Sequence, residues 1–187
     1  NEHQKYLNMT NLILSLVAIG IFVIYNAVAI HFFGIPKSLS ETFYLYQNKK
    51  KSLGYIFTGM MFTVALTLMP AWIEITEVIS TWSHYLTVLP FLGTGMIAFV
   101  GAAPAFRSCE LESKVHTISA TTAAVFSLLW CAVVCYKIAY IIPISAVIIW
   151  SIAFATKTQK TAQTYWWEMV AFLATFTTIV TECIILL

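Results

Sequence analysis

Aspartate is absent from this sequence, and charged residues of every kind are scarce. All 8 acidic residues are glutamates, and charged residues make up 10% of the 187, against roughly 25% in an ordinary soluble domain. These figures exclude a soluble globular domain, a disordered chain and a nucleic-acid-binding protein. The missing aspartate also excludes catalytic chemistry that depends on one.

Cysteine and glycine are also sparse, and neither forms a recognisable catalytic or metal-binding motif. The 4 cysteines include no CxxC pair, so a zinc ribbon or thioredoxin-type motif is not available, and we expect free thiols. The glycines are too scattered for a phosphate-binding loop, and we expect Gly95 and Gly101 to allow close helix packing. Ser108 lies near a histidine in the sequence, but no GxSxG elbow surrounds it. We therefore expect no cofactor.

Long hydrophobic runs, by contrast, fill most of the chain. Hydrophobic residues make up 60% of it, and the mean hydropathy is +0.84. A bilayer core needs about 20 apolar residues per helix, so these runs predict an all-α, polytopic integral membrane bundle in a single domain. The first run lacks a basic segment and a small-residue cleavage site, so we interpret it as a span rather than a signal peptide. The six predicted spans are residues 11–31, 53–73, 86–103, 116–135, 138–156 and 166–187.

The basic residues predict the orientation of the bundle. Eight of the 10 lie in the first, third and fifth connections, which predicts that these connections are cytoplasmic and both termini outside. A plasma membrane or bacterial inner membrane is the expected location. Lys49, Lys50 and Lys51 are predicted either to contact anionic lipid headgroups or to serve only as a topology anchor. Aromatic belts are expected at the outer boundary (Trp72, Trp82, Tyr85, Trp130, Tyr136 and Tyr140) and at the inner one (Trp150, Tyr165, Trp166 and Trp167).

The first connection is the longest, and it contains a helix signal. Ser38 and Glu41 have the spacing of a capping box, and the aromatic stretch Phe43-Tyr44-Leu45-Tyr46 follows. We expect a short interfacial helix that begins near Leu39 and places its aromatic side chains in the headgroup region.

Polar side chains within the spans are the first candidates for function, because an ionisable group in a bilayer is costly and often functional. Glu182 lies deepest. It is either a proton or cation site that faces the bundle interior, or a partner for a tyrosine hydroxyl or for Lys137. Glu168 is predicted to interact with the dipole at the start of the sixth helix, and Asn26 to form a hydrogen bond between helices.

Two histidines and several glutamates gather at the predicted inner boundary. His31 ends the first span and His116 begins the fourth, and Glu41, Glu110 and Glu112 lie on the same side. Imidazole and carboxylate groups bind zinc, so His31, His116 and Glu112 are candidate metal ligands, and His116, Glu110 and Glu41 are candidate catalytic residues. No HExxH or HxxxH motif accompanies them. In the alternative interpretation, His116 caps the bundle by bonding a carbonyl or a glutamate.

The fourth span carries small and weakly polar residues on one face. At 3.6 residues per turn they fall within about 100° of arc, and such a stripe lets helices approach closely. Ala98 and Ala102 have the matching spacing on the third span, so we expect these two spans to pack together at the bundle centre. The stripe consists of His116, Ala120, Ala124, Ser127, Cys131 and Cys135, and the opposite, lipid-facing side of Val125, Phe126, Leu129 and Val133.

A short stretch also resembles a known membrane family. Residues 101–104, Gly-Ala-Ala-Pro, precede a polar connection and then His116-Thr-Ile-Ser-Ala120, and the long first connection carries Ile35-Pro36. This pattern resembles the six-helix group that includes DRAM-like proteins and their uncharacterised bacterial relatives. The resemblance implies a six-helix topology but no reaction, and Cys109-Glu110 stands where that group often has an aspartate.

Three functions remain open at this point. The leading hypothesis is a small membrane protein without robust catalytic activity that acts through contacts with lipid, with a membrane-protein partner or with a second copy of itself. The first alternative is a metal-dependent lipid hydrolase that uses His31, His116 and a glutamate. The second is a proton-coupled carrier that uses Glu182 and Asn26, which predicts a central polar cavity and a helix broken at a proline.

Overall fold

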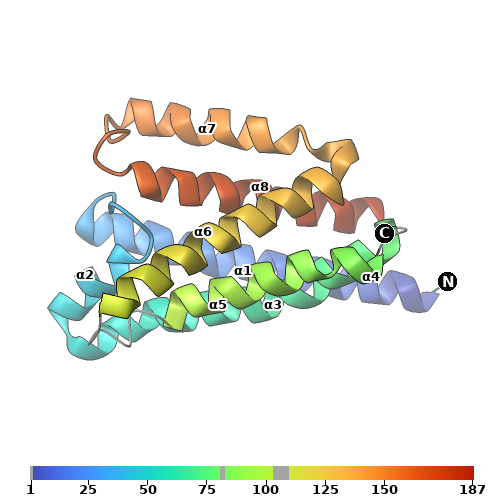
Figure 1. Ribbon diagram of the computed structural model, residues 1–187, viewed down its shortest axis with the longest axis horizontal. Helices are drawn as coiled ribbons and strands as arrows, with labels where there is room; N and C mark the ends of the chain where they lie inside the picture. Colours follow the sequence, from blue (N-terminus) through green and yellow to red (C-terminus); the bar gives the residue numbers. More distant parts are fainter. Residues whose placement is uncertain (1, 81–82, 103–109) are drawn as a thin grey trace.

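The computed structural model describes the backbone of residues 2–80, 83–102 and 110–187, and the side chains of residue 6 and of residues 8–80, 85–102 and 117–187. In these ranges the regular secondary structure is helical throughout, which confirms the predicted all-α fold. The long helices run along one common direction, and the two ends of the chain lie at the same end of the bundle (Figure 1).

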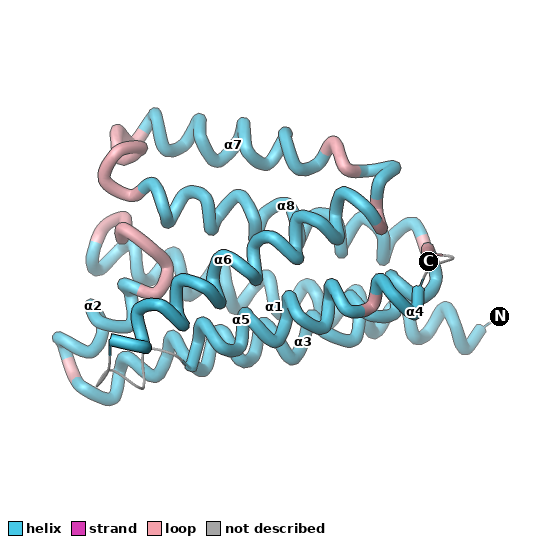
Figure 2. The backbone as a smooth tube through the Cα atoms, viewed as in Figure 1, coloured by secondary structure: helices cyan, strands magenta, loops and turns pink. Residues whose placement is uncertain are grey.

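Each predicted hydrophobic run coincides with a helix, and the connections contain shorter helical elements (Figure 2). The helices that match the runs are α1 (Glu2–Phe33), α3 (Tyr55–Ile79), α5 (Val88–Ala102), α6 (Glu110–Val133), α7 (Ile141–Ala155) and α8 (Gln163–Ile185). The shorter elements are α2 (Glu41–Lys49), α4 (Ser83–Leu86) and the 3₁₀ turns Lys51–Gly54 and Tyr136–Ile138.

The helices differ in how well their length matches a bilayer. Three segments, Asn8–Phe33, Lys51–Ile79 and Gln163–Ile185, are long and apolar enough to cross a membrane. Val88–Ala102, Thr117–Val133 and Ile141–Ala155 are shorter apolar helices.

Proline breaks none of the described helices. Pro90 and Pro143 are the third residues of α5 and α7, where a missing N–H removes no bond within the helix. Pro70 lies inside α3, which continues through it to Ile79. The broken helix expected of a carrier is therefore not seen at any of the three positions.

The predicted pairing of the third and fourth spans is confirmed. In the described part of the chain, α5 and α6 pack together more extensively than any other helix pair. Ser127 and Cys131 of α6 are buried, whereas Val125 and Leu129 on its other side are exposed, as the stripe predicted.

Glycines of α5 also bring this helix close to α3. A Cβ atom placed on Gly101 would lie 2.6 Å from the Cβ atom of Met61, and one placed on Gly93 would lie 2.9 Å from the Trp72 ring. No atom lies within 4 Å of the same position on Gly95. The prediction of close packing is thus correct for Gly101 and wrong for Gly95, because Gly95 is on the exposed side of α5.

Several tryptophans lie in the interior rather than in a belt. Trp72 and Trp130 are both 0% exposed, and their rings meet edge to face with centroids 5.4 Å apart. The Trp130 indole N–H donates to the Thr76 hydroxyl at 2.8 Å, which satisfies it without water or headgroups. The outer-belt prediction is therefore wrong for Trp72 and Trp130, whereas Tyr136 and Tyr140 are exposed as a belt requires. At the other end, the predicted inner belt is wrong for Tyr165 and Trp166, which are buried.

The first connection forms the predicted short helix, α2. The Ser38 hydroxyl accepts the N–H of Glu41 at 3.3 Å, which is one half of the predicted capping box. The other half is not formed, because the Glu41 carboxylate accepts the N–H of Lys37 rather than that of Ser38, and the residue that precedes α2 is Ser40. Phe43 and Tyr46 are buried against the bundle, so the prediction that they lie among headgroups is wrong. Burial raises the pKa of the Tyr46 hydroxyl above its ordinary value. The apolar face of α2 instead covers one end of the bundle.

Candidate functional site

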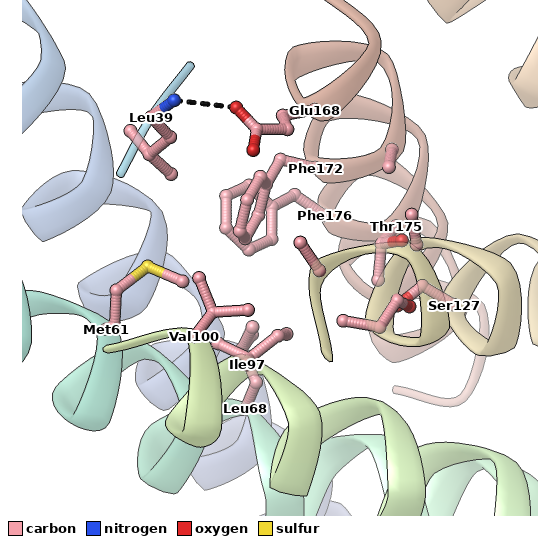
Figure 3. Close-up of a pocket in the computed structure, with 14 residues that line it drawn as sticks. Leu39, Met61, Leu68, Ile97, Val100, Ser127, Glu168, Phe172, Thr175 and Phe176 are labelled. Atoms are coloured by element: carbon pink, nitrogen blue, oxygen red, sulfur yellow. Dashed lines mark hydrogen bonds between the residues drawn. The ribbon is translucent and has the colours of Figure 1, made fainter. Parts of the chain in front are cut away.

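A pocket lies between α3, α5, α6 and α8 in the interior of the bundle (Figure 3). A water-sized sphere can occupy about 50 Å³ of it, within about 520 Å³ of space that continues to the outside. Its walls are apolar apart from the Glu168 carboxylate and the hydroxyls of Ser127 and Thr175, and the small alanines of α6 leave it open. The lining side chains include Met61, Ile97, Val100, Ala120, Ala123, Ala124, Glu168, Phe172, Thr175 and Phe176.

Glu168 is the ionisable side chain among the lining residues. Its carboxylate accepts the backbone N–H of Leu39 at 2.6 Å, and Figure 3 shows this bond at one end of the pocket, beside Phe172. Leu39 lies in the turn just before α2, where the backbone N–H has no partner within the helix. Glu168 therefore fixes the α1–α2 connection over the bundle with one oxygen, and its other oxygen is free to accept a bond from a ligand.

The predicted role of Glu168 at the helix dipole is wrong. α8 begins at Gln163, three residues before the predicted start, so Glu168 lies in the second turn of the helix. The dipole effect falls off within the first turn. The carboxylate is engaged by a backbone group from a distant segment instead.

The two lining hydroxyls on α6 and α8 differ in their bonding. The Ser127 hydroxyl donates to the Ala123 carbonyl at 2.6 Å, one turn earlier in its own helix. The Thr175 hydroxyl lies near the Cys131 thiol but is buried without a hydrogen-bond partner among the described residues. Glu168 is thus the charged group, and Thr175 the unpaired hydroxyl, through which a ligand in this pocket would be recognised.

Asn26 forms the predicted bond between helices. Its amide donates to the Phe22 carbonyl at 2.9 Å, and its oxygen accepts the Tyr165 hydroxyl of α8 at 3.1 Å. Glu182 lies at the opposite end of α8, 17 residues beyond Tyr165, which is about 25 Å along a helix. The structure does not bring together the two residues that the carrier hypothesis combined.

A second group of polar side chains lies at that opposite end. Glu182 is buried beside the Cys135 thiol and near Lys137, one of the partners predicted for it. The Asn11 amide donates to the Glu74 carboxylate of α3, and the Asn8 amide donates to the Leu186 carbonyl at 2.6 Å. These bonds join the ends of α1, α3 and α8.

The predicted metal and catalytic residues are only partly described. The His31 side chain is exposed, and its ring packs edge-on against Phe32. The Glu41 carboxylate accepts the backbone N–H of Lys37 at the start of α2. The side chains of Glu110, Glu112 and His116 lie outside the described residues, although their backbone belongs to α6. Among the described side chains, no three of His, Cys, Asp or Glu are grouped so as to hold a metal ion.

The remaining predicted residues are the lysines at the end of α2 and the cysteines. Lys49, Lys50 and Lys51 are exposed at the end of α2, so their contact with lipid headgroups stays a prediction. Cys131, Cys135 and Cys183 are free and buried, as expected, and Cys109 lies outside the described residues.

Two contacts that hold the segment around α2 in place were not foreseen from the sequence. One is the bond between Glu168 and Leu39. The other is the bond between Tyr25 of α1 and Thr42 of α2, whose hydroxyl oxygens are 2.5 Å apart. The available signal was the position of Glu168 inside an apolar run, which predicts that the carboxylate has a partner but not which one.

Comparison with known proteins adds no relatives to this description. The chain matches no family model, no curated protein and no solved structure.

Proposed function

We propose that this chain is an integral membrane protein that crosses the bilayer six times and acts through contacts with membrane lipid. The observation that carries the proposal is the outward face of the long helices. Large apolar side chains from five of them are 58–66% exposed, an arrangement that favours a hydrocarbon environment. These side chains are Ile24, Leu66, Phe99, Val147 and Ile184.

The distribution of lysines supports an orientation with both termini outside. The exposed lysines of the α1–α2 and α7–α8 connections lie at one end of the bundle, and Lys137 lies at the other. Because basic residues are retained on the cytoplasmic side, the first end faces the cytoplasm of a plasma membrane or bacterial inner membrane. The six-helix DRAM-like group, which the sequence resembles, would share this topology.

The interior pocket is where a lipid is bound. Its small volume favours a single apolar chain over a bulkier ring system, because only about 50 Å³ is accessible to a sphere as large as water. Glu168 accepts a hydrogen bond from a hydroxyl, amide or amine at the polar end of that chain. The proposed ligand class is therefore a lipid with one accessible apolar chain and a hydrogen-bond donor beside it.

Filling the pocket tests this proposal. We expect Ala124→Phe to lower the amount of lipid that copurifies in a mild detergent, as measured by native mass spectrometry and lipid extraction. Val125→Phe is the matched control, because Val125 is the next residue and points away from the pocket. Ala124→Leu provides a smaller change if Ala124→Phe does not fold.

Equal lipid content in the Ala124 and Val125 variants, with both variants folded, would contradict a lipid site in the pocket. The described side chains give neither the hydrolase nor the carrier hypothesis a comparable observation. Association with a second copy remains a proposal, and it would use the exposed outer faces, since the α6 stripe is inside the bundle.

A further inference from the structure

A second apolar surface lies outside the bundle core, in a groove between α1, α7 and α8. Its volume is about 380 Å³, many times the roughly 30 Å³ that one water molecule takes up. Figure 1 shows α7 along one side of the molecule, beside α8 and away from α3 and α5. The side chains that line the groove include Leu16, Ile19, Phe22, Val23, Ile149, Met169, Phe172, Leu173, Phe176 and Val180.

The groove has the length of a lipid chain. On α8 it extends from Met169 to Thr181, which is about 18 Å at 1.5 Å per residue. One leaflet of a bilayer core is about 15 Å thick, half of the full 30 Å. The groove is therefore long enough for most of an extended acyl chain.

Each of the three helices that form the groove has an exposed lysine just beyond the same end. Lys37 follows the end of α1 by four residues, Lys157 follows α7 by two, and Lys160 precedes α8 by three. The two connections that hold these lysines are tied together at the start of α8, because the Tyr165 N–H donates to the Lys37 carbonyl at 3.0 Å.

Lys157 and Lys160 are the charged residues of the α7–α8 connection, which borders the groove. Residues 156–167 contain no acidic side chain, whereas Lys37 has Glu41 close to its backbone. The exposed lysines 49–51 are at the end of α2, which does not line the groove. Of the connections that border the groove, the α7–α8 connection therefore offers an anion the most positive charge.

This connection holds Lys157 in a fixed and unusual conformation. Its φ of 58° is in the left-handed region, where glycine is the favoured residue at the end of a helix. The next residue is held on both sides, since the Thr158 N–H donates to the Ala153 carbonyl and its hydroxyl accepts the Trp166 indole N–H. A lysine occupies a glycine position in an ordered turn, which indicates a role for its side chain.

We propose that the α1–α7–α8 groove binds an anionic phospholipid, with an acyl chain along α8 and the phosphate between Lys157 and Lys160. In this placement the glycerol backbone and the first methylene groups lie along the part of α8 from Gln163 to Met169, which is about 9 Å long. This inference rests on the membrane placement proposed above, but it does not depend on the interior pocket.

The test compares two lipids that have the same acyl chains and differ in the net charge of the headgroup. Purified protein in mild detergent is mixed with equal amounts of dioleoylphosphatidylglycerol and dioleoylphosphatidylcholine, and bound lipid is counted by native mass spectrometry. We expect a preference for the anionic lipid of about fivefold per lysine. Lys157→Gly removes one charge while favouring the left-handed turn, so the preference falls without loss of folding, and Lys157→Gly with Lys160→Gln abolishes it.

Two controls assign the effect to this groove. Lys137→Gln removes a lysine from the opposite end and leaves the preference unchanged. Thr177→Trp fills the groove and lowers binding of both lipids, whereas Val147→Trp on the exposed side of α7 does not. An unchanged preference in the double lysine variant, or equal binding in the two tryptophan variants, overturns the proposal.

Failure of this inference can be separated from failure of the membrane placement. Sidedness of Lys160 and Lys137, measured by cysteine labelling, tests the placement alone. Opposite sidedness with no preference for the anionic lipid means that the groove inference is wrong while α7 crosses the membrane as proposed.

Discussion

Trp72 fits inside the bundle because residue 93 of α5 has no side chain. A Cβ atom on Gly93 would lie 2.9 Å from Cη2 of the Trp72 ring, and that ring is completely buried against Trp130. We expect Gly93→Ala to lower the free energy of unfolding by about 1–3 kcal/mol, since a crowded core forces strained side chains. Thermal unfolding in detergent, followed by tryptophan fluorescence, measures the effect.

Gly95→Ala is the control for this prediction. The same substitution two residues along α5 meets no atom within 4 Å, and alanine stabilises a helix interior by about 0.5–1 kcal/mol relative to glycine. Gly95→Ala should therefore melt at or slightly above the parent temperature. If Gly93→Ala melted as high as Gly95→Ala, the Trp72 ring would not be confined as described.

A second prediction at the residue scale concerns Glu168. Glu168→Leu leaves the Leu39 N–H without an acceptor and should lower the unfolding free energy by about 1–3 kcal/mol. Glu168→Gln keeps an oxygen that can accept this bond, so it should melt close to the parent. A circular-dichroism melt of the three proteins gives the comparison, and equal melting of the Leu and Gln variants would argue against the bond.

At the scale of single residues, the hydrogen-bond and packing partners of side chains were the hardest feature to predict from the sequence. The sequence indicated that Asn26 forms a bond between helices, and the bond exists, because a buried amide has to be satisfied. It did not indicate Tyr165 as the partner, since spacing relates residues only within one helix. Trp72 and Trp130 were misplaced for a related reason, as their surroundings depend on Gly93 and Thr76 from other parts of the chain.

At the scale of elements, α7 is the most loosely held of the long helices. It packs mainly on α8 and makes little contact with α6, and its buried residues are Ile141, Ser145 and Ala153. α3, by comparison, has buried residues along its whole length. We expect amide hydrogen exchange in detergent micelles to be faster in α7 than in α3, because local opening follows the amount of buried contact. Slower exchange in α7 would contradict this packing.

The hydrophobic runs predicted the positions of the helices more accurately than the residues at which the helices begin and end. The ends of α5 and α7 are within three residues of the ends of the predicted spans. The agreement is close because the length of an apolar run sets how much of a helix can face apolar surroundings. α3 continues past the predicted end at residue 73 to Ile79, and there the Asn11 amide bonds the Glu74 carboxylate. α6 begins at Glu110 rather than at residue 116, because a polar segment extends the helix beyond its apolar part.

For the whole molecule, the charge distribution makes a direct prediction of sidedness. With Cys109→Ser as background, the remaining cysteines are buried. In intact cells or right-side-out vesicles, a membrane-impermeant maleimide should then label Lys137→Cys but not Lys160→Cys, and permeabilisation should expose both. Labelling of both positions before permeabilisation would mean that the two ends are not on opposite sides of a membrane.

The bond between Leu39 and Glu168 joins residues 129 positions apart, and the other contacts between α1 and α8 are as distant. During synthesis at about 5–20 residues per second, the segment before α2 waits roughly 6–26 s for its partner. The early helices are therefore made well before these polar groups are satisfied. Until α8 packs against them, the Leu39 N–H and the Asn26 amide oxygen lack the partners that they have in the folded bundle.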